Sequence, residues 1–301
     1  MNRLGIDLGG TKIEIAVLDD GGQFLHRARI ATPQGDYAAI LDAVTNLVRV
    51  SEQSFGPFLS IGLGTPGSIS RKTGAMKNSN STCLNGRELL GDLRASLAPV
   101  FRGEIRIAND ANCFALSEAV DGAGQGERTV FGVILGTGVG GGLVVDGRIV
   151  DGPNGIAGEW GHNRLASDAG IGVDAPRPCY CGREGCVETL LSGPGLAQSH
   201  RIATGIALSP EEIDMHARSG DDACEQTLEA YARNLARALA VVVNIVDPDV
   251  IVLGGGLSNI ELLYERVPRL WGEWIFTDEV LTRLVRNQHG DSSGVRGAAW
   301  L

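Results

Sequence analysis

Leu4-Gly-Ile-Asp7-Leu-Gly9-Gly10-Thr11-Lys12-Ile13-Glu-Ile-Ala-Val-Leu18 consists of two apolar runs on either side of a glycine-rich turn. This pattern predicts a β-hairpin. Sliding residues 4–19 onto residues 131–146 without a gap gives a second hairpin of the same kind. Five of its sixteen positions are identical, at Gly5/Gly132, Leu8/Leu135, Gly9/Gly136, Val17/Val144 and Asp19/Asp146. The identity is weak, but each copy opens a block of strands, and a duplicated architecture is the better interpretation.

Strand and helix patterns alternate along the rest of the chain. We expect a strand at 23–30, helices at 36–53, 111–119 and 228–244, and further strands at 59–64, 104–108 and 249–253. A last helix should begin near Ser292 or Ser293. This alternation predicts an α/β fold.

Composition limits the partners and the compartment. The 301 residues include 26 Lys and Arg against 36 Asp and Glu, for a net charge of −10. Such a chain repels phosphate backbones and anionic lipid, so we expect neither nucleic acid nor a membrane as a partner. The start of the chain has no signal-peptide pattern, and no apolar run reaches the roughly 18 residues of a membrane span. We therefore expect a cytoplasmic protein with reduced cysteines.

One histidine and three cysteines have the spacing of a zinc site. They lie in Ala157-Gly-Glu159-Trp-Gly-His162 and in Cys179-Tyr-Cys181-Gly-Arg-Glu-Gly-Cys186-Val-Glu188. Thiolates and imidazole are the ligands of closed tetrahedral zinc sites. The zinc could have a purely structural role and hold the loop together. Alternatively, it could also fix the two neighbouring carboxylates, Glu159 and Glu188, in space.

Three glycine-rich turns follow predicted strands. The first is Gly9-Gly10-Thr11-Lys12, the second runs from Gly136 to Gly142, and the third is Gly254-Gly255-Gly256. Backbone N–H groups in such turns bind anions, and Asp7 before the first turn could hold Mg²⁺. Each turn could alternatively be only a tight hairpin or a flexible loop. Together they indicate nucleotide binding.

Asn109-Asp110 stands between a predicted strand and a predicted helix. Asn and Asp are common helix N-caps, so a purely structural role is a strong alternative. A carboxylate at the carboxyl end of a strand also faces the ligand site of an α/β sheet. Asp110 could there accept the proton of an attacking hydroxyl in phosphoryl transfer.

These motifs together resemble the ROK family of repressors and sugar kinases. The matching motifs are D-x-G-G-T-K from Asp7, N-D-A-N from Asn109, G-T-G-x-G-G-G from Gly136, E-W-G-H from Glu159 and C-x-C-G-x-x-G-C-x-E from Cys179. The resemblance implies an actin-like, ribonuclease-H-like ATPase fold of two lobes with a central cleft. It implies an N-terminal lobe of residues 1–115, on which a C-terminal helix at about 290–301 packs. Residues 116–289 would form the C-terminal lobe, with a zinc-binding loop at 157–188.

The resemblance also implies a role for each matching residue. Asp110 would be the catalytic base, and Asp7 would help to hold Mg²⁺. Sugar hydroxyls would be bound by Asn109, Glu159, His162 and Glu188, with Asn80 as an additional contact. ATP phosphates would lie on Gly9, Gly10, Thr11, Lys12, Gly136, Thr137 and Gly138, and adenosine near Gly254, Gly255 and Gly256. A structural zinc ion would be held by His162, Cys179, Cys181 and Cys186.

The substrate implied is a free hexose, phosphorylated by ATP at its 6-hydroxyl. Residues 77–86, 158–163 and 289–300 look like the bacterial fructokinase group, which favours D-fructose, with mannose accepted. The stretch N-D-A-N-C-F-A-L-S-E-A at 109–119 is shared with the N-acetylglucosamine kinases of the family, which makes that sugar the alternative and glucose the third candidate. Because family members are commonly dimers, we expect a homodimer.

Proteins of other classes fit less well. A transcription regulator of the family would carry a DNA-binding domain before the first glycine turn, which begins too early here to leave room for one. A non-catalytic sugar sensor would be expected to lack Asp110 or one of the phosphate turns, and all of these are present.

Overall fold

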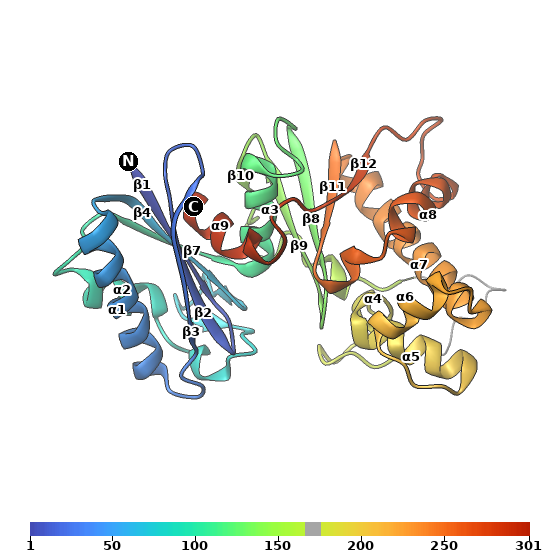
Figure 1. Ribbon diagram of the computed structural model, residues 1–301, viewed down its shortest axis with the longest axis horizontal. Coiled ribbons are helices and arrows are strands. Elements are labelled where there is room, and N and C mark those ends of the chain that lie inside the picture. The colour runs from blue at the N-terminus through green and yellow to red at the C-terminus, as the bar shows by residue number, and fades with distance from the viewer. Residues whose placement is uncertain (166–175) are drawn as a thin grey trace.

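The computed structural model describes residues 1–165 and 176–301 and has two five-stranded sheets with two helices between them (Figure 1). In each sheet an antiparallel hairpin is extended on one side by two parallel strands. The first sheet has the order β3 (Phe24–Ala31), β2 (Lys12–Leu18), β1 (Asn2–Leu8), β4 (Phe58–Thr65), β7 (Glu104–Asn109). The second has the order β10 (Arg148–Ile149), β9 (Val139–Val145), β8 (Thr129–Leu135), β11 (Val250–Gly254), β12 (Arg283–Arg286). This confirms the predicted α/β class.

The gapless alignment of the two hairpins is also confirmed. The bounds of β1 and β2 become those of β8 and β9 when shifted by the offset that carries Leu4 onto Phe131. The two sheets also share the same strand order. The architecture is therefore duplicated, although few residues of the two copies are identical.

The two central helices approach the sheets at glycines. Helix α9 (Ser293–Trp300) packs on β1 and β4, and α3 (Asp110–Asp121) packs on β8 and β9. A Cβ atom on Gly5 of β1 would lie 2.2 Å from the carbonyl oxygen of Val295, and one on the aligned Gly132 of β8 would lie 2.7 Å from the Cβ of Ala115. Both glycines are therefore required for close helix–sheet packing.

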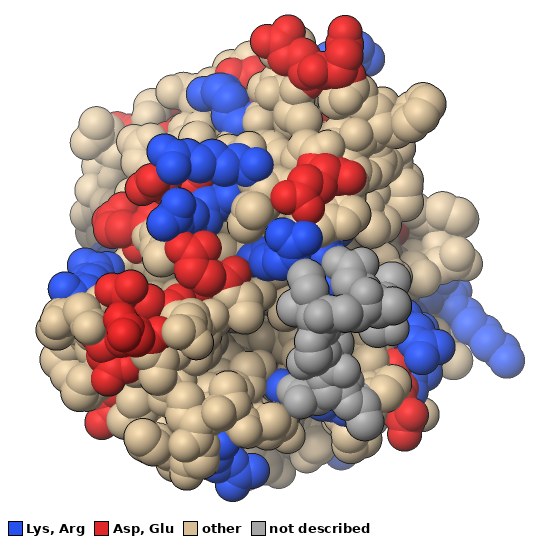
Figure 2. All heavy atoms as spheres, turned by 90° about the vertical axis from the view of Figure 1, so that its right-hand side faces the viewer, with Lys and Arg blue, Asp and Glu red and all other residues tan. Residues whose placement is uncertain are grey.

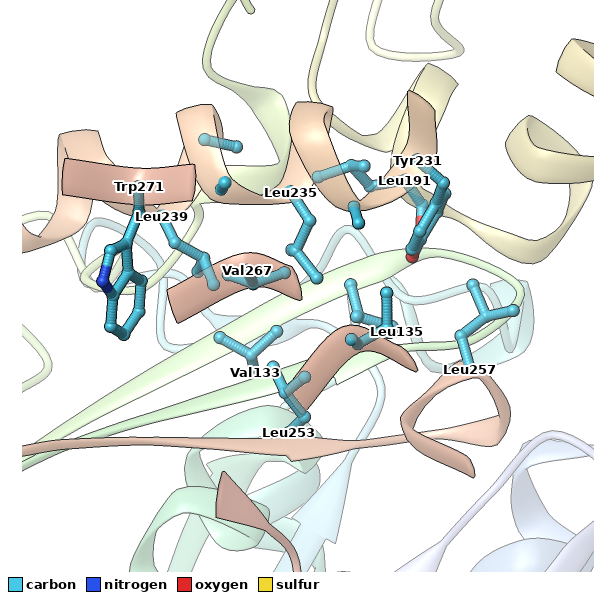
Figure 3. Packing of buried hydrophobic residues seen from close by; sticks show 14 of the residues in the cluster. Val133, Leu135, Leu191, Tyr231, Leu235, Leu239, Leu253, Leu257, Val267 and Trp271 are labelled. Carbon is cyan, nitrogen blue, oxygen red and sulfur yellow. The ribbon is translucent and has the colours of Figure 1, made fainter. Parts of the chain in front are cut away.

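The outer faces of the sheets are covered by the remaining helices. On the first sheet these are α1 (Tyr37–Phe55) and α2 (Leu89–Leu97); a small hairpin of β5 (Ser68–Ile69) and β6 (Met76–Lys77) lies between them in sequence. The helical part of the second half contains α4 (Glu188–Leu191), α5 (Gly193–Thr204), α6 (Pro210–Arg218), α7 (Asp222–Val246) and α8 (Leu262–Leu270). In Figure 3, Leu235 and Leu239 of α7 and Val267 of α8 point toward Val133, Leu135 and Leu253 of the sheet.

Alternating residues of one strand enter different cores. Ile251 and Leu253 of β11 pack under α7, whereas Val250 and Val252 pack against α3. A strand buried on both faces is continuously apolar, as the run 249–253 suggested. Every helix and strand that the sequence predicted is present, and α1 begins directly after Asp36, its N-cap. The short strands β5, β6, β10 and β12 and the helices α2, α4, α5, α6 and α8 were not predicted.

The boundary between the lobes stays a proposal. Helix α3 is continuous through residue 115, where we expected the first lobe to end, and it packs on the second sheet. We therefore propose that the chain crosses from one lobe to the other at Asn109–Asp110. The middle of the expected zinc loop, residues 166–175, lies outside the described residues. Within the described residues no helix has the length and apolarity that crossing a membrane would require.

Candidate active site

Asp110 lies where β7 ends and α3 begins. The helix is capped by Asn109, whose Oδ1 accepts a hydrogen bond of 2.7 Å from the backbone N–H of Asn112. Oδ1 of Asp110 accepts one of 2.8 Å from the N–H of Ala111, and the residue remains accessible to solvent. The capping role therefore belongs to Asn109, and the second carboxylate oxygen of Asp110 can accept a proton.

Two carboxyl groups at this point, those of Asp110 and Asp7, have raised pKa values. Desolvation raises the pKa of Asp110, and the charge of Glu159 raises it further against the opposing hydrogen bond from Ala111. The pKa of Asp7, at the end of β1, rises from 3.8 to about 6, first through burial and then through the charges of Asp110 and Glu14. Strongly perturbed carboxylates at strand ends mark a functional site, and their shared negative charge suits a divalent cation.

A cluster around Glu14 lies beside Asp7 and was not predicted. Asp7 pairs with Glu14 across β1 and β2, and Glu14 pairs with Arg29 across β2 and β3. The Glu14 side chain is fully buried; it accepts hydrogen bonds from Arg27 and from Arg29, the latter at 2.6 Å. The two arginines alternate along β3, and this spacing was the available signal. Nζ of Lys12 lies 4.0 Å from Glu14, so this predicted phosphate ligand belongs to the same cluster.

The first glycine turn is held rigidly. The N–H of Gly9 donates to the carbonyl of Lys12 at 2.9 Å, and the hydroxyl of Thr32 donates to the carbonyl of Gly9 at 2.8 Å. A Cβ atom on Gly10 would lie 3.3 Å from Oγ of Ser81, so the exposed Asn80 belongs to a segment beside this turn. The contacts of this segment thus place Asn80 near the first turn.

The second and third turns lie against each other. The N–H of Gly136 donates to the carbonyl of Gly138 at 3.0 Å, which closes the turn and leaves Thr137 exposed. Gly255 has φ +80°, and a Cβ atom there would lie 2.4 Å from the carbonyl oxygen of Leu135, next to the second turn. Gly256 has open space beside it, whereas the space beside Gly254 is taken by the ring of Phe114. Gly254 therefore has a packing role, because it makes room for the ring of Phe114 from α3.

The N-terminus of α5 also belongs to these turns. The N–H of Gly193 donates to the carbonyl of Gly136 at 2.8 Å, and a Cβ atom on Gly193 would lie 3.5 Å from Cγ of Pro210 at the start of α6. Gly193 was not predicted as part of the site. Its only signal in the sequence was the Ser-Gly-Pro-Gly run at residues 192–195, which begins a helix.

The four predicted zinc ligands converge. Their ligand atoms all lie within 4.8 Å of one another: His162, Cys179, Cys181 and Cys186. Sγ of Cys181 is 3.6 Å from Sγ of Cys186, and Sγ of Cys179 is 3.7 Å from Nδ1 of His162. Bonds of about 2.3 Å at the tetrahedral angle separate two sulfur ligands by roughly 3.8 Å. The residues therefore fit a tetrahedral zinc ion.

The thiol chemistry also suits a metal. All six cysteines are free, and Arg183 lowers the pKa of Cys181 to about 6, toward the thiolate that binds zinc. Because Nδ1 of His162 faces Cys179, its Nε2 stays available and lies 3.1 Å from the Tyr180 hydroxyl. A metal on Nδ1 would leave Nε2 protonated, so His162 could hold zinc and still donate a hydrogen bond.

Both predicted carboxylates extend from the zinc loop toward the turns. Oε2 of Glu188 accepts a hydrogen bond of 2.9 Å from the N–H of Val139, directly after Gly138 of the second turn. Glu159 precedes Trp160, whose Nε1 donates to the carbonyl of Gly140 at 2.9 Å. The loop is thus anchored along β9, with Glu188 at the second turn and Glu159 close enough to Asp110 to raise its pKa.

Comparison with known proteins identifies the family. The model of the ROK family matches residues 3–301. The chain belongs to the ROK family. An N-acetyl-D-glucosamine kinase from Photobacterium profundum is 39% identical over 300 residues, which cover 99% of this chain and 98% of that protein. This confirms the resemblance drawn from the motifs.

Solved ROK structures share the fold. The ROK hexokinase from Thermus thermophilus superimposes with a TM-score of 0.86 at 31% identity, over 99% of this chain and 97% of that one. A ROK glucokinase from Streptomyces griseus, in complex with glucose and AMPPNP, gives a TM-score of 0.76 at 27% identity, over 99% and 98% of the two chains. The actin-like ATPase fold is therefore confirmed.

Proposed function

We propose that this ROK protein is a sugar kinase that transfers the γ-phosphoryl group of ATP to the 6-hydroxyl of N-acetyl-D-glucosamine. The observation that carries the proposal is the similarity to an N-acetyl-D-glucosamine kinase along nearly the whole of both chains. The retained carboxylate at Asp110 and the intact glycine turns support catalysis over a non-catalytic sensor.

The choice of sugar differs from our first expectation. The fructokinase-like segments at 77–86, 158–163 and 289–300 favoured fructose, but the relatives support the alternative, N-acetylglucosamine. Fructose remains the second candidate on one observation: residues 79–85 pack beside the first glycine turn, where they would be near the substrates.

The geometry supports a simple mechanism. Asp110 would accept the proton of the 6-hydroxyl as its oxygen attacks the γ-phosphorus, because the raised pKa keeps this carboxylate basic enough for the step. Asn109, Glu159 and His162 would orient the sugar from the neighbouring segments. Phosphoryl transfer depends mainly on such positioning and on charge stabilisation.

The remaining residues would position the nucleotide and the loop. The N–H groups of the first two glycine turns would bind ATP phosphates, and Asp7 would hold Mg²⁺, which neutralises the charge that develops on the phosphoryl group. Zinc on His162 and the three cysteines would fix the loop that carries Glu159 and Glu188, a supporting role with no open coordination position.

Turnover on a panel of sugars tests the proposal. Zinc-replete protein with ATP and Mg²⁺ would be assayed by coupled ADP release on N-acetylglucosamine, fructose, mannose and glucose. We expect the highest kcat/KM with N-acetylglucosamine. A higher kcat/KM with fructose would make fructose the substrate and leave the proposed mechanism unchanged. Unchanged activity in Asp110→Asn would show that Asp110 is not the base.

A further inference from the structure

An acidic protein holds phosphate groups through local donors better than through a broad charged surface. The chain has a net charge of −10. Figure 2 looks onto the helical end of the molecule, where Lys and Arg side chains are interleaved with Asp and Glu. A surface of such mixed charge does not concentrate positive potential. We therefore expect further phosphate contacts to be hydrogen-bond donors close to the glycine turns, and the hydroxyl of Ser81 lies there.

The Ser81 hydroxyl faces the first glycine turn. Ser81 directly precedes the 3₁₀ helix η1 (Thr82–Leu84), a position at which serine commonly caps a helix with its hydroxyl, but here the hydroxyl makes no capping bond. A Cβ atom on Gly10 would instead lie 3.3 Å from Oγ of Ser81. The hydrogen bonds of Ser81 within the described residues are made by its backbone, with Oγ of Ser79 at 3.1 Å and with the N–H of Leu84 at 3.0 Å. The hydroxyl is therefore free to donate to a ligand at the turn.

The segment that carries Ser81 is closed by the side chain of Asn85. Its Oδ1 accepts a hydrogen bond of 2.9 Å from the N–H of Ser79, and its Nδ2 donates one of 2.9 Å to the carbonyl of Ser79. Asn78, directly before the segment, has φ +57°, a left-handed conformation that asparagine adopts more readily than most residues. Because Asn85 ties the end of the segment to its start, Ser81 between them is held in place.

The same segment also contacts the chain that follows β4. Gly67, two residues beyond that strand, has φ +81°, and a Cβ atom there would lie 2.7 Å from the backbone nitrogen of Ser79. Thr65, the last residue of β4, pairs with Asn109 at the end of β7, directly before the expected base. These contacts connect the first glycine turn with the strand ends of the expected sugar site, and the Ser81 hydroxyl lies on the side of the turn.

We propose that the Ser81 hydroxyl donates a hydrogen bond to the γ-phosphoryl group of ATP, and that Asn85 is the positioning residue that holds the hydroxyl there. The inference rests on the proposed kinase function. Serine hydroxyls are common donors to phosphate oxygens, and a donor aimed at the transferring group stabilises the charge that develops on it. The γ-phosphoryl group is the part of ATP that moves toward the sugar, so a donor between the turn and the sugar site contacts that part.

Isothermal titration calorimetry with a non-hydrolysable ATP analogue and with ADP tests the contact, in zinc-replete protein with Mg²⁺. We expect Ser81→Ala to weaken binding of the analogue about 10- to 100-fold, the usual effect of losing a hydrogen bond to a charged group. ADP should bind as it does to the wild type, because it lacks the γ-phosphoryl group. Thr82→Ala is the matched control, since it removes the hydroxyl of the next, exposed residue and should leave both affinities unchanged.

Asn85→Ala tests the positioning role. Loss of both bonds to Ser79 should weaken binding of the analogue about as much as Ser81→Ala does. The double variant should be little weaker than either single variant, because both substitutions act through one hydroxyl. An Asn85→Ala effect that adds in full to that of Ser81→Ala, or that weakens ADP equally, would show that Asn85 has only a structural role.

Three outcomes would overturn the Ser81 contact. They are unchanged binding of the analogue in Ser81→Ala, equal weakening of the analogue and ADP, and an equal effect of Thr82→Ala. If the wild-type protein binds neither nucleotide, the proposed kinase function fails and the inference fails with it. If the wild type binds both nucleotides and Ser81→Ala binds them equally well, only the inference fails.

Discussion

Replacing Asp7 by Asn should make the protein more stable while abolishing its activity. Burial and the neighbouring charges raise the pKa of Asp7 from 3.8 to about 6. The folded state therefore binds the proton of Asp7 more tightly than the unfolded state does, so its contribution to stability is complete below pH 3.8 and is lost as the pH rises through 6. Asparagine stays neutral and retains that stability.

The size of the effect follows from the same shift. Each pKa unit corresponds to about 1.4 kcal/mol, so ionising Asp7 in the folded state costs at most roughly 3 kcal/mol. Partial access to solvent screens the charges, and we expect Asp7→Asn to raise the free energy of unfolding by about 1–3 kcal/mol at pH 7.5. At pH 4.5 the same linkage leaves less than about half of that difference.

Thermal or urea unfolding at the two pH values, with Mg²⁺ absent, measures the difference between variant and wild type. Adding Mg²⁺ should then stabilise the wild type and not the variant. Asp20→Asn is the control, because the N-terminal ammonium lowers the pKa of this surface carboxylate. An Asp7→Asn protein that is less stable than wild type at pH 7.5, or equally shifted at both pH values, would refute the reasoning.

Three further variants test the site. Asp110→Asn should lower kcat by about 10²–10⁴, the usual contribution of a general base, and leave sugar binding measurable by calorimetry; a wild-type kcat would contradict this. Glu159→Gln removes a charge that raises the pKa of Asp110, so the acid limb of the profile of kcat/KM against pH should move to lower pH. An acid limb at the same pH would show that Glu159 does not affect the ionisation of Asp110. Cys181→Ser should lose zinc by elemental analysis and activity together, and a zinc-free variant that keeps full activity would show that the metal does not position Glu159 and Glu188.

The local sequence pattern predicted most of the fold because both halves of the chain have the same order of strands. The alternation of apolar runs with glycine turns located the hairpins, and Asp36 and Asn109 marked the starts of two helices as N-caps. Short edge strands such as β10 and β12 were not predicted, because a strand of two or four residues is too short to show a recognisable alternation of apolar and polar residues.

The site was predictable where its residues are consecutive. The zinc ligands and the carboxylates beside them share one loop, and the spacing of Cys179, Cys181 and Cys186 specifies their chemistry. The contacts of Glu14 with Arg27 and Arg29 depend on strand register, so the alternation of the two arginines could not by itself identify Glu14 as their partner. The approach of Gly193 to the second glycine turn depends on the packing of α5 and therefore could not be predicted from the sequence either.

The most direct test of the central claim is the identity of the reaction product. Zinc-replete protein would be incubated with ATP, Mg²⁺ and N-acetylglucosamine, and the product examined by phosphorus NMR. The account predicts a phosphomonoester on the 6-oxygen that forms with wild-type protein and not with Asp110→Asn. A phosphate on another oxygen, or no phosphorylated sugar from any hexose of the panel, would contradict it.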